Sequence, residues 1–568
     1  MPMSTIVRPS TAETPPSSSW WHPWLATPGA VVVVYLLTVF ATDPQFMADT
    51  TRYAQQLTSA SAESMWEFGH LLWRPLGWVL LQLIGPLTAR FVGPSPQANA
   101  VLALVGVSLL AGLVSVVALH RLLHRASDNV LVVNLVVLAF IFTNGFLNYA
   151  QSGAPYVAGL ALLLVGVYLL NRGGQQRPPS TPEAILAGVS LAGAVGFWFL
   201  YVFALPAALA SPLFLWGRAR ASRRAVFYAG LTVAAGTALL YAAAASLALG
   251  ITSLPKFVDW MGADRRIGTA RGLPRAVFGF ARSFVDMGRD GVLFRRFLAN
   301  DPYNSVPLGN LLRFSLWKLA LFYAAMAALV VLLARSPLGR RALALLALWG
   351  APVIGFAVFW QGGAIERYLP LYPMLFLGVA IGVRAPFRWR VVAVPLAFFI
   401  VAAATNVNVM ALPSLYERQE HDVDRVRPVL PLLEEGSRLF TITQRDELFL
   451  FGQDFPFHPL NRDGGLALAY VVDFGHYYAP QWRTLFATRV SAVWGEGGEV
   501  WVTTRVLASR PQPGWDWVEG EDPRVSWQDL HAFFAALEWG ERVGGEDGFV
   551  HLRRSRASEE LLNGLKRK

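Results

Sequence analysis

The sequence predicts a polytopic α-helical membrane protein with a small soluble α/β domain at its carboxyl end. Of the 568 residues, 54% are hydrophobic and only 15% are charged, whereas soluble domains carry about 25% charged residues. Apolar runs recur through the first 410 residues, and they have the length of roughly 20 residues that a helix needs to cross a bilayer. Beyond residue 411, acidic residues and short strand-like and helix-like segments replace these runs.

Charge and cysteine content exclude several classes of protein. The net charge is +11, but much of the arginine lies in short loops between apolar runs, where positive charge marks the cytoplasmic side of a membrane. We therefore expect a lipid bilayer as partner and no nucleic acid. The chain has no cysteine, which excludes disulfides, zinc–thiolate sites and thiol catalysis. A divalent metal is compatible with the sequence but not indicated, so we expect no cofactor.

The amino-terminal region is expected to be a disordered cytoplasmic tail followed by an uncleaved anchor. Residues 1–24 are rich in Pro, Ser and Thr and lack the basic segment of a cleavable signal. Trp20, Trp21 and Trp24 occupy the place of an interfacial aromatic belt. The first span is predicted from about residue 25 to residue 42.

The next apolar piece, residues 76–91, is expected to lie in the membrane plane or to enter and return. If it crossed, the basic stretch 120–125 would face the same side as the first loop, against the cytoplasmic preference of Lys and Arg. With residues 76–91 in the plane, every later short loop agrees with that preference. Ten further spans are then predicted at residues 99–119, 130–149, 155–171, 184–200, 201–217, 225–249, 314–334, 342–360, 366–383 and 391–409. They complete an eleven-span domain over residues 25–410 of a cell (inner) membrane protein.

Two long segments are expected outside the membrane on the extracytoplasmic side. Residues 250–313 interleave arginines with apolar residues, especially over 276–284, a pattern typical of an interfacial amphipathic helix whose basic face meets lipid phosphates. A solvated loop with incidental charge is the alternative.

Residues 411–568 are expected to form a small α/β domain. Strands are predicted at residues 438–443, 499–505 and 548–553, and helices at residues 481–494 and 526–538. This domain contains no phosphate-binding loop or hydrolase elbow, so no chemistry is assigned to it.

Ionisable residues cluster just after the first span. Asp43, Asp49, His70 and Arg74 follow an uncharged run and precede the next apolar segment. Charged groups are costly inside a bilayer, so a cluster at its edge indicates function. The alternative is that any first loop of a membrane protein is polar.

Several short motifs follow one another in a recognisable order. They are Asp49-Thr-Thr-Arg-Tyr53, His70-Leu-Leu-Trp-Arg74-Pro75, Phe91-Val-Gly-Pro94-Ser95, His120-Arg121-Leu-Leu-His124, Leu147-Asn-Tyr149-Ala-Gln151 and Glu366-Arg367-Tyr368-Leu369-Pro370. In this order the chain resembles the membrane glycosyltransferases of the GT-C superfamily, nearest the branch of protein mannosyltransferases and lipid A aminoarabinose transferases. The resemblance covers roughly residues 25–410. Thr50 and Gln151 stand where that branch has a glutamate and often an acidic residue.

The resemblance implies an inverting glycosyltransferase that uses a polyprenyl-phosphate-linked sugar as donor and a glycan, lipid or protein as acceptor. Such a transfer needs a base near the acceptor's proton and cations near the departing phosphate. Asp49 is the expected base, and Asp43 is the alternative. The residues expected to bind substrate are Tyr53, His70, Arg74, Arg265, Arg266, Glu366, Arg367 and Tyr368.

Two other functional classes stay open. A transporter or flippase would need ionisable residues deep in its spans, but the predicted spans hold few charges, and Asn134, Asn144 and Asn148 are better suited to joining helices. A non-catalytic scaffold that presents residues 411–568 is the third class.

Overall fold

The computed structural model describes most of the chain. The described residues are 27–42, 44, 49–59, 65–92, 96–172, 179–217, 220–262, 272–287, 308–383, 389–411, 428–434, 436–442, 468–471, 481–509, 526–545 and 548–566. The predicted tail at residues 1–24, the alternative base Asp43 and the predicted donor contacts Arg265 and Arg266 lie outside them.

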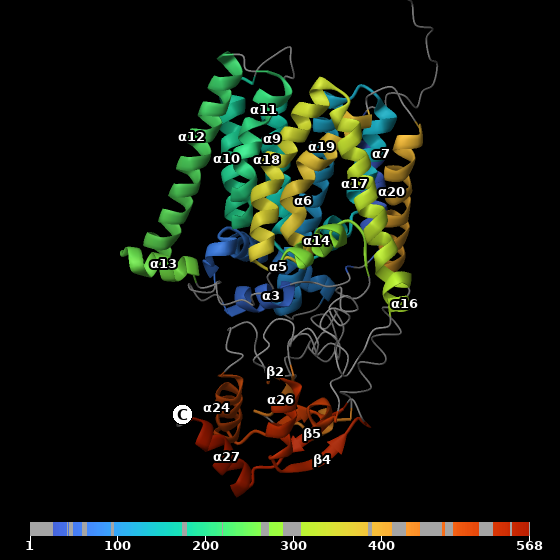
Figure 1. Ribbon diagram of the computed structural model, residues 1–568. Helices are drawn as coiled ribbons and strands as arrows, with labels where there is room; N and C mark the ends of the chain where they lie inside the picture. The colour runs from blue at the N-terminus through green and yellow to red at the C-terminus, as the bar shows by residue number, and fades with distance from the viewer. Residues whose placement is uncertain are drawn as a thin grey trace, which may run out of the picture.

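Upright helices form a bundle that makes up the membrane domain (Figure 1). They are α2 (Gly29–Ala41), α6 (Pro96–Ala126), α7 (Val130–Ile141), α9 (Tyr156–Asn171), α10 (Thr181–Phe197), α11 (Leu205–Leu215), α12 (Arg220–Ala243), α17 (Trp317–Ala334), α18 (Pro337–Phe359), α19 (Tyr372–Val383) and α20 (Trp389–Met410). A helix thus lies within every predicted span, which confirms a polytopic helical protein. Among the described residues, five helices are long and apolar enough to cross a membrane alone, or six if the bent pair α7–α8 is one span. The number of eleven crossings stays a prediction.

Side-chain caps begin three of the upright helices. The Ser180 hydroxyl accepts from the Glu183 backbone N–H, and the Glu183 carboxylate accepts from the Ser180 N–H, so α10 opens with a capping box. Ser336 caps α18, which has Pro337 in its first turn, and Asn129 caps α7. These caps satisfy backbone donors that the first helical turn leaves without partners.

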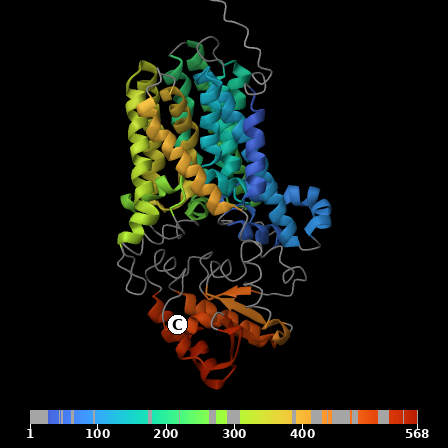
Figure 2. The ribbon, with the colours of Figure 1, turned by 90° about the vertical axis from the view of Figure 1, so that its right-hand side faces the viewer.

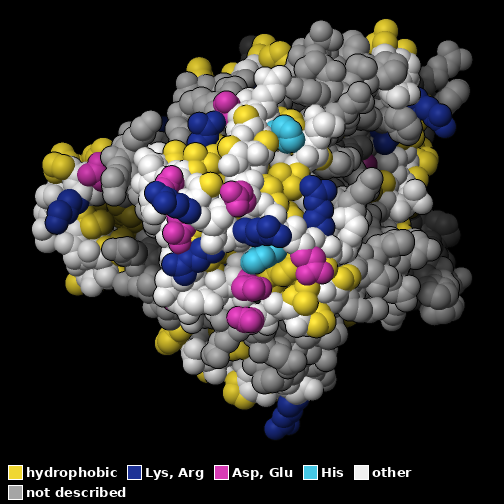
Figure 3. Space-filling view, turned by 90° about the horizontal axis from the view of Figure 1, so that it is seen from below, with side chains coloured by type: hydrophobic (Ala, Val, Ile, Leu, Met, Phe, Trp, Pro, Cys, Tyr) yellow, Lys and Arg dark blue, Asp and Glu magenta, His cyan; other side chains and the backbone are white. Residues whose placement is uncertain are grey.

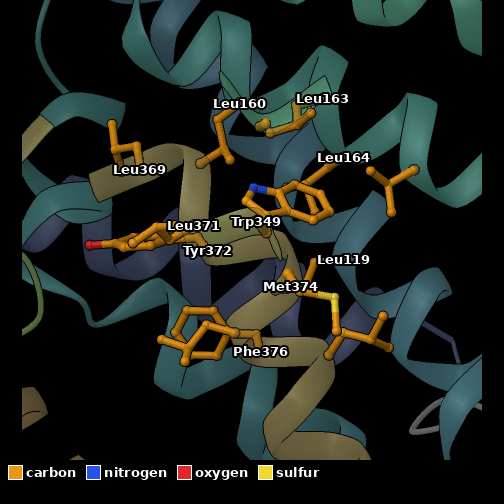
Figure 4. Close-up of a cluster of buried hydrophobic side chains, with 14 of the residues drawn as sticks. Leu119, Leu160, Leu163, Leu164, Trp349, Leu369, Leu371, Tyr372, Met374 and Phe376 are labelled. Carbon is orange, nitrogen blue, oxygen red and sulfur yellow. The ribbon is translucent and has the colours of Figure 1, made fainter. Parts of the chain in front are cut away.

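The core of the bundle is apolar and aromatic. Figure 4 shows the indole of Trp349 on α18 beside Leu160, Leu163 and Leu164 of α9. The indole N–H of Trp349 donates to the Pro370 carbonyl at 2.7 Å, so this large buried ring leaves no polar atom unsatisfied.

The other helices of this domain, most of them short, gather at one end of the bundle (Figures 1 and 2). They are α3 (Thr50–Ser59), η1 (Phe68–His70), α5 (Trp73–Val92), α8 (Asn144–Ala150), η2 (Phe199–Ala204), η3 (Ala244–Ala248), α13 (Leu254–Gly262), α14 (Leu273–Arg282), α16 (Leu308–Leu311), η6 (Leu312–Leu316) and η7 (Ile365–Leu371). Helix α5 lies at this end beside α3 and does not run among the upright helices. This agrees with the prediction that residues 76–91 do not span.

One predicted span, residues 130–149, is broken rather than continuous. It consists of α7 and α8, which meet at an angle of 68°. The break is stabilised by the chain that follows α14, because the backbone N–H of Gly145 donates to the Ser283 carbonyl at 2.8 Å. The Asn144 side chain also donates to the Arg282 carbonyl at 2.9 Å. Asn144 therefore joins helices, as the sequence predicted.

The carboxyl-terminal domain is a mixed sheet with helices packed against it. Its strands are β1 (Arg438–Thr441), β2 (Leu468–Tyr470), β3 (Val500–Thr503), β4 (Trp539–Val543) and β5 (Phe549–Leu552), in the order β2-β1-β3-β5-β4. Strand β1 pairs in parallel with β2 and β3, whereas β5 pairs antiparallel with β3 and β4. The helical segments are η8 (Leu430–Leu432), α24 (Trp482–Gly495), η12 (Thr504–Leu507), α26 (Trp527–Ala535) and α27 (Arg556–Lys566).

This domain confirms the predicted α/β class. The predicted strands and helices coincide with β1, β3, β5, α24 and α26. Strands β2 and β4 and helix α27 were not predicted, because β2 has three residues and β4 and α27 are rich in charged residues. The domain lies below the end of the bundle that carries the short helices (Figure 1). Its lower face mixes basic and acidic side chains (Figure 3).

Candidate active site

Asp49 lies at the start of α3, at the short-helix end of the bundle. The backbone N–H of Tyr53 donates to the Asp49 carbonyl at 2.9 Å, and the Tyr53 hydroxyl lies 3.4 Å from the Asp49 carboxylate. The two side chains share a helical face, as expected for residues four apart. Burial, together with the charge of Asp49, raises the pKa of the Tyr53 hydroxyl well above its usual value. Tyr53 therefore stays protonated and donates to Asp49.

Arg74 is buried next to this pair and is bound by three side chains. Its guanidinium forms an ion pair with Glu67, its Nε donates to the Gln56 amide oxygen at 2.5 Å, and its central carbon lies 4.6 Å from the Tyr53 ring centroid. One nitrogen, Nη1, is buried and has no hydrogen-bond partner among the described residues. Arg74 thus orders Glu67 and Tyr53, and its contact with a donor phosphate stays a prediction.

The charge states of Glu67 and His70 follow from burial and from Arg74. Burial alone would raise the pKa of the Glu67 carboxyl, but the neighbouring Arg74 outweighs burial and lowers that pKa to about 2. Burial lowers the pKa of His70 to about 4, so the ring is neutral at pH 7. Its Nδ1 lies 3.3 Å from the Phe197 carbonyl, which can only accept. Nδ1 therefore carries the proton and Nε2 bears a lone pair.

A series of aromatic rings leads away from Tyr53. Tyr53 meets His70 edge to face with ring centroids 5.9 Å apart, and His70 meets Tyr156 at the same distance. Tyr156 in turn contacts Tyr149 and Trp198, each at 4.7 Å. This ring series joins the first outer loop to the late Glu366-Arg367 motif.

Glu366 and Arg367 lie at the far end of the ring series. The Glu366 carboxylate accepts from the Tyr149 hydroxyl at 2.7 Å, and Arg367 lies 5.7 Å from the Trp198 ring centroid. Arg367 Nη2 donates to the Gln361 amide oxygen at 2.7 Å. Gln361 adopts a φ of 49°, which is uncommon outside glycine and is often found at functional sites. The structure therefore brings Glu366 and Arg367 into one cluster with Tyr53 and His70.

The hydroxyl of Tyr368 binds backbone groups, and its contact with substrate stays a prediction. This side chain is fully buried, and its hydroxyl lies 2.8 Å from the Ala276 carbonyl and 2.6 Å from the Gly362 carbonyl. The Tyr368 hydroxyl thus links α14 to the loop that contains Gly362. Tyr368 is not part of the ring series. A sequence motif could not predict that its hydroxyl would bind these two backbone carbonyls.

Five residues of this cluster were not among the predicted site residues, although Tyr149 stands in one of the motifs. They are Glu67, Tyr149, Tyr156, Trp198 and Arg282. Arg282, on α14, is buried, donates from Nη1 to the Gly363 carbonyl at 3.1 Å and interacts electrostatically with Glu366. Its position within a run of arginines could have indicated a binding role, but that run did not distinguish it from its neighbours. The described residues contain no group of three or more His, Asp or Glu side chains that could hold a metal ion.

Comparisons with known proteins reveal relatives in structure only. No family model and no curated protein matches the sequence. The structure of ArnT from Cupriavidus metallidurans in the apo state matches with a TM-score of 0.52 and 12% identity, covering 96% of this chain and 99% of that chain. The same protein bound to undecaprenyl phosphate matches with a TM-score of 0.50 and 12% identity, covering 94% and 98%. The chain therefore has the fold of that protein over nearly its whole length.

Proposed function

From the fold that this chain shares with ArnT, a GT-C membrane glycosyltransferase, we propose that it transfers a sugar from a polyprenyl-phosphate-linked donor to an acceptor outside the cytoplasm. ArnT has been solved with undecaprenyl phosphate, and we propose a lipid of this class as the carrier here. The protein would lie in the inner membrane with its amino terminus in the cytoplasm and residues 411–568 outside.

One observation carries this proposal. Two polar motifs that are far apart in the sequence, Asp49 to Arg74 and Glu366-Arg367, meet through one series of aromatic rings at a single end of the bundle. Each end of the series thus carries a carboxylate and a guanidinium, Asp49 with Arg74 at one end and Glu366 with Arg367 at the other. Glycosyl transfer needs a base near the acceptor's proton and cations near the departing phosphate.

Asp49 is the proposed general base. As the acceptor's hydroxyl or amine attacks the anomeric carbon of the donor, its proton passes to the Asp49 carboxylate. The bond between that carbon and the phosphate oxygen breaks, and the electron pair leaves with the polyprenyl phosphate. A single displacement of this kind inverts the configuration of the sugar. The Tyr53 hydroxyl holds the carboxylate in place.

Cationic groups would stabilise the departing phosphate. Arg367 Nε and Arg74 Nη1 are buried and have no hydrogen-bond partner among the described residues. Charge-assisted hydrogen bonds from such donors to a phosphate are about twice as strong as neutral ones. Arg265 and Arg266 are further candidates for this role, and the acceptor is proposed to be a glycan, a lipid or a protein.

The test is replacement of Asp49 by Asn in protein reconstituted with an undecaprenyl-phosphate-linked sugar. This change keeps the size of the side chain and removes its basic oxygen, so turnover should fall by roughly 10²–10⁴-fold while donor binding stays nearly unchanged. Asp43→Asn is the matched control and should cost far less. If the two results exchange places, the base is Asp43, and if neither change matters, the proposal fails.

Donor binding provides a second test. Changing Arg265 and Arg266 together to glutamate should weaken binding of the phosphate-linked lipid, because charge-assisted contacts are lost and repulsion replaces them. Affinity can be measured by titrating labelled undecaprenyl phosphate into the purified protein. An unchanged dissociation constant would show that this pair is only part of a solvated loop.

A further inference from the structure

Aromatic residues from three helical segments, η2, α12 and α13, contact the backbone segment that carries Glu67 and His70. The ring of Phe68 lies within 4.8 to 6.3 Å of four other rings, centroid to centroid. Those rings belong to Phe199, Tyr241, Phe257 and Trp260. We call these five residues the aromatic clamp.

Two side chains of the clamp donate hydrogen bonds to the backbone on either side of Glu67. The indole N–H of Trp260 donates to the Trp66 carbonyl at 2.9 Å, and the Tyr241 hydroxyl donates to the Phe68 carbonyl at 3.1 Å. These two carbonyls belong to the residues immediately before and after Glu67. The backbone N–H of His70 donates in turn to the Glu67 carbonyl at 3.2 Å. The clamp thus fixes the backbone on both sides of Glu67. Through the hydrogen bond from His70 to Glu67, it also fixes the turn that carries His70.

Helix α13 contributes two of the five clamp residues. It extends from the foot of α12 at the edge of the bundle (Figure 1), and none of its residues is fully buried. Its apolar residues Phe257 and Trp260 pack against the ring of Phe68. In its first turn Leu254 is 75% exposed, as suits a helix that rests on lipid.

We propose that Tyr241 and Trp260 are positioning residues for the reaction, which set the place of Glu67 and His70 beside Asp49 and Tyr53. This inference rests on the proposed function. If the segment shifted, the Glu67 carboxylate would separate from Arg74, whose guanidinium packs on the Tyr53 ring. Misplacement of catalytic groups by about 1 Å costs up to roughly 10²-fold in rate.

The test uses Tyr241→Phe and Trp260→Phe, each of which removes one hydrogen bond and keeps an aromatic ring in the clamp. Turnover should fall about 10-fold in each variant, with donor affinity unchanged, because the shift affects orientation within the site. Tyr35→Phe is the matched control, since its buried hydroxyl also donates to a backbone carbonyl, that of Leu109 at 2.9 Å, away from the clamp. It should leave turnover unchanged.

A second measurement does not depend on the enzyme's activity. Hydrogen–deuterium exchange of peptides that cover residues 66–72 should be faster in both clamp variants and unchanged in Tyr35→Phe. Faster exchange with unchanged turnover would overturn the positioning role, and so would unchanged exchange in both variants. An equal loss of turnover in Tyr35→Phe would show that the effect is general loss of stability, which also overturns it.

The same experiments separate this inference from the proposed function. If neither Asp49→Asn nor Asp43→Asn affects transfer, the proposed function fails. If Asp49→Asn abolishes transfer while the clamp variants retain it in full, the proposed function stands and the positioning role is refuted.

Discussion

The ion pair of Glu67 and Arg74 lies next to the candidate base. The Arg74 side chain is fully buried, and that of Glu67 is 18% exposed. Taking two such charges out of water costs several kcal/mol per ion, and attraction between them offsets this only with good geometry and further hydrogen bonds. Gln56 and the face of the Tyr53 ring supply those further contacts to Arg74. The pair is therefore best understood as fixing the positions of its neighbours.

Replacing Glu67 with Gln should lower the free energy of unfolding by about 3–5 kcal/mol, because Arg74 would remain buried without its counter-ion. Thermal unfolding in detergent measures this change. The double variant Glu67→Gln/Arg74→Met removes both charges and should recover much of the loss. An unchanged melting temperature in the single variant would contradict a buried pair.

The free energy of unfolding should decrease at acid pH, because folding lowers the pKa values of both His70 and Glu67. The pKa of His70 falls from 6.5 to about 4 on folding, so the unfolded chain binds more protons between these values and stability decreases as pH falls through that range. Glu67 acts in the same direction between 4.5 and about 2. Melting temperatures across pH should show that His70→Asn removes the first component and Glu67→Gln the second. A variant curve parallel to that of the wild type would refute either assignment.

For single residues, the sequence predicted the stretch that holds the candidate site, but it did not predict all the side chains that surround this stretch. The stretch from Asp49 to Arg74 could be found because ionisable groups follow an uncharged span. Tyr156 and Trp198 could not be found, because each looks like any aromatic residue at a helix end until the fold places it between the two motifs. The backbone partners of the Tyr368 hydroxyl could not be predicted either, because a motif does not reveal which carbonyls surround a side chain.

Among the elements, α14 is joined to the late motif by close backbone approach. A side-chain carbon on Gly279 would collide with the Gly362 carbonyl oxygen, and one on Gly362 would lie 2.7 Å from the Ala276 backbone nitrogen. The Tyr368 hydroxyl reaches backbone carbonyls on both sides of this contact. Helix α14 can therefore present Arg282 to the cluster only while both glycines lack side chains.

Gly279→Ala should lower the free energy of unfolding by about 1–3 kcal/mol, because the added methyl group forces α14 away from the late loop. Turnover should fall as well, since Arg282 moves with the helix. Gly355→Ala on α18 is the control, because open space surrounds that position. Equal melting temperatures in the two variants would contradict the close approach.

The predicted helices were found where apolar runs had the length of a span, since that length reflects bilayer thickness alone. The break between α7 and α8 could not be predicted in this way. Thr143 and Asn144 look like isolated polar insertions in an apolar run, and the groups that stabilise the break come from residues 282–284 and from Asn406. Long-range partners of this kind leave no periodic signal.

In the whole molecule, the short helices and the carboxyl-terminal domain occupy the same end (Figures 1 and 2). Placement at one end requires that the loops which carry the candidate site and residues 411–568 face one side of the membrane. From the distribution of arginine in the short loops, we predict that this side is the outer one.

Because the chain has no cysteine, single cysteines can test this topology directly. Cysteines at Thr58, Arg90 and Glu541 should all react with an impermeant thiol reagent added from outside, and one at Arg125 should be protected. Membrane permeabilisation should expose the Arg125 position and serve as the control. Protection of the Arg90 position alone would mean that α5 crosses the membrane and that the eleven-span topology is wrong.

The bend between α7 and α8 has a consequence for how the protein is made. The bend leaves the Phe142 carbonyl without a partner in its own helix. The side-chain amide of Asn406 donates to this carbonyl, and Asn406 is synthesised 264 residues later. An unsatisfied backbone group inside a bilayer costs several kcal/mol, so the bend must wait for the last membrane helix. Nascent chains truncated before residue 406 should therefore expose position 147 to labelling that the full chain excludes. Tyr149 lies on α8, so the candidate site would be completed only after insertion of α20.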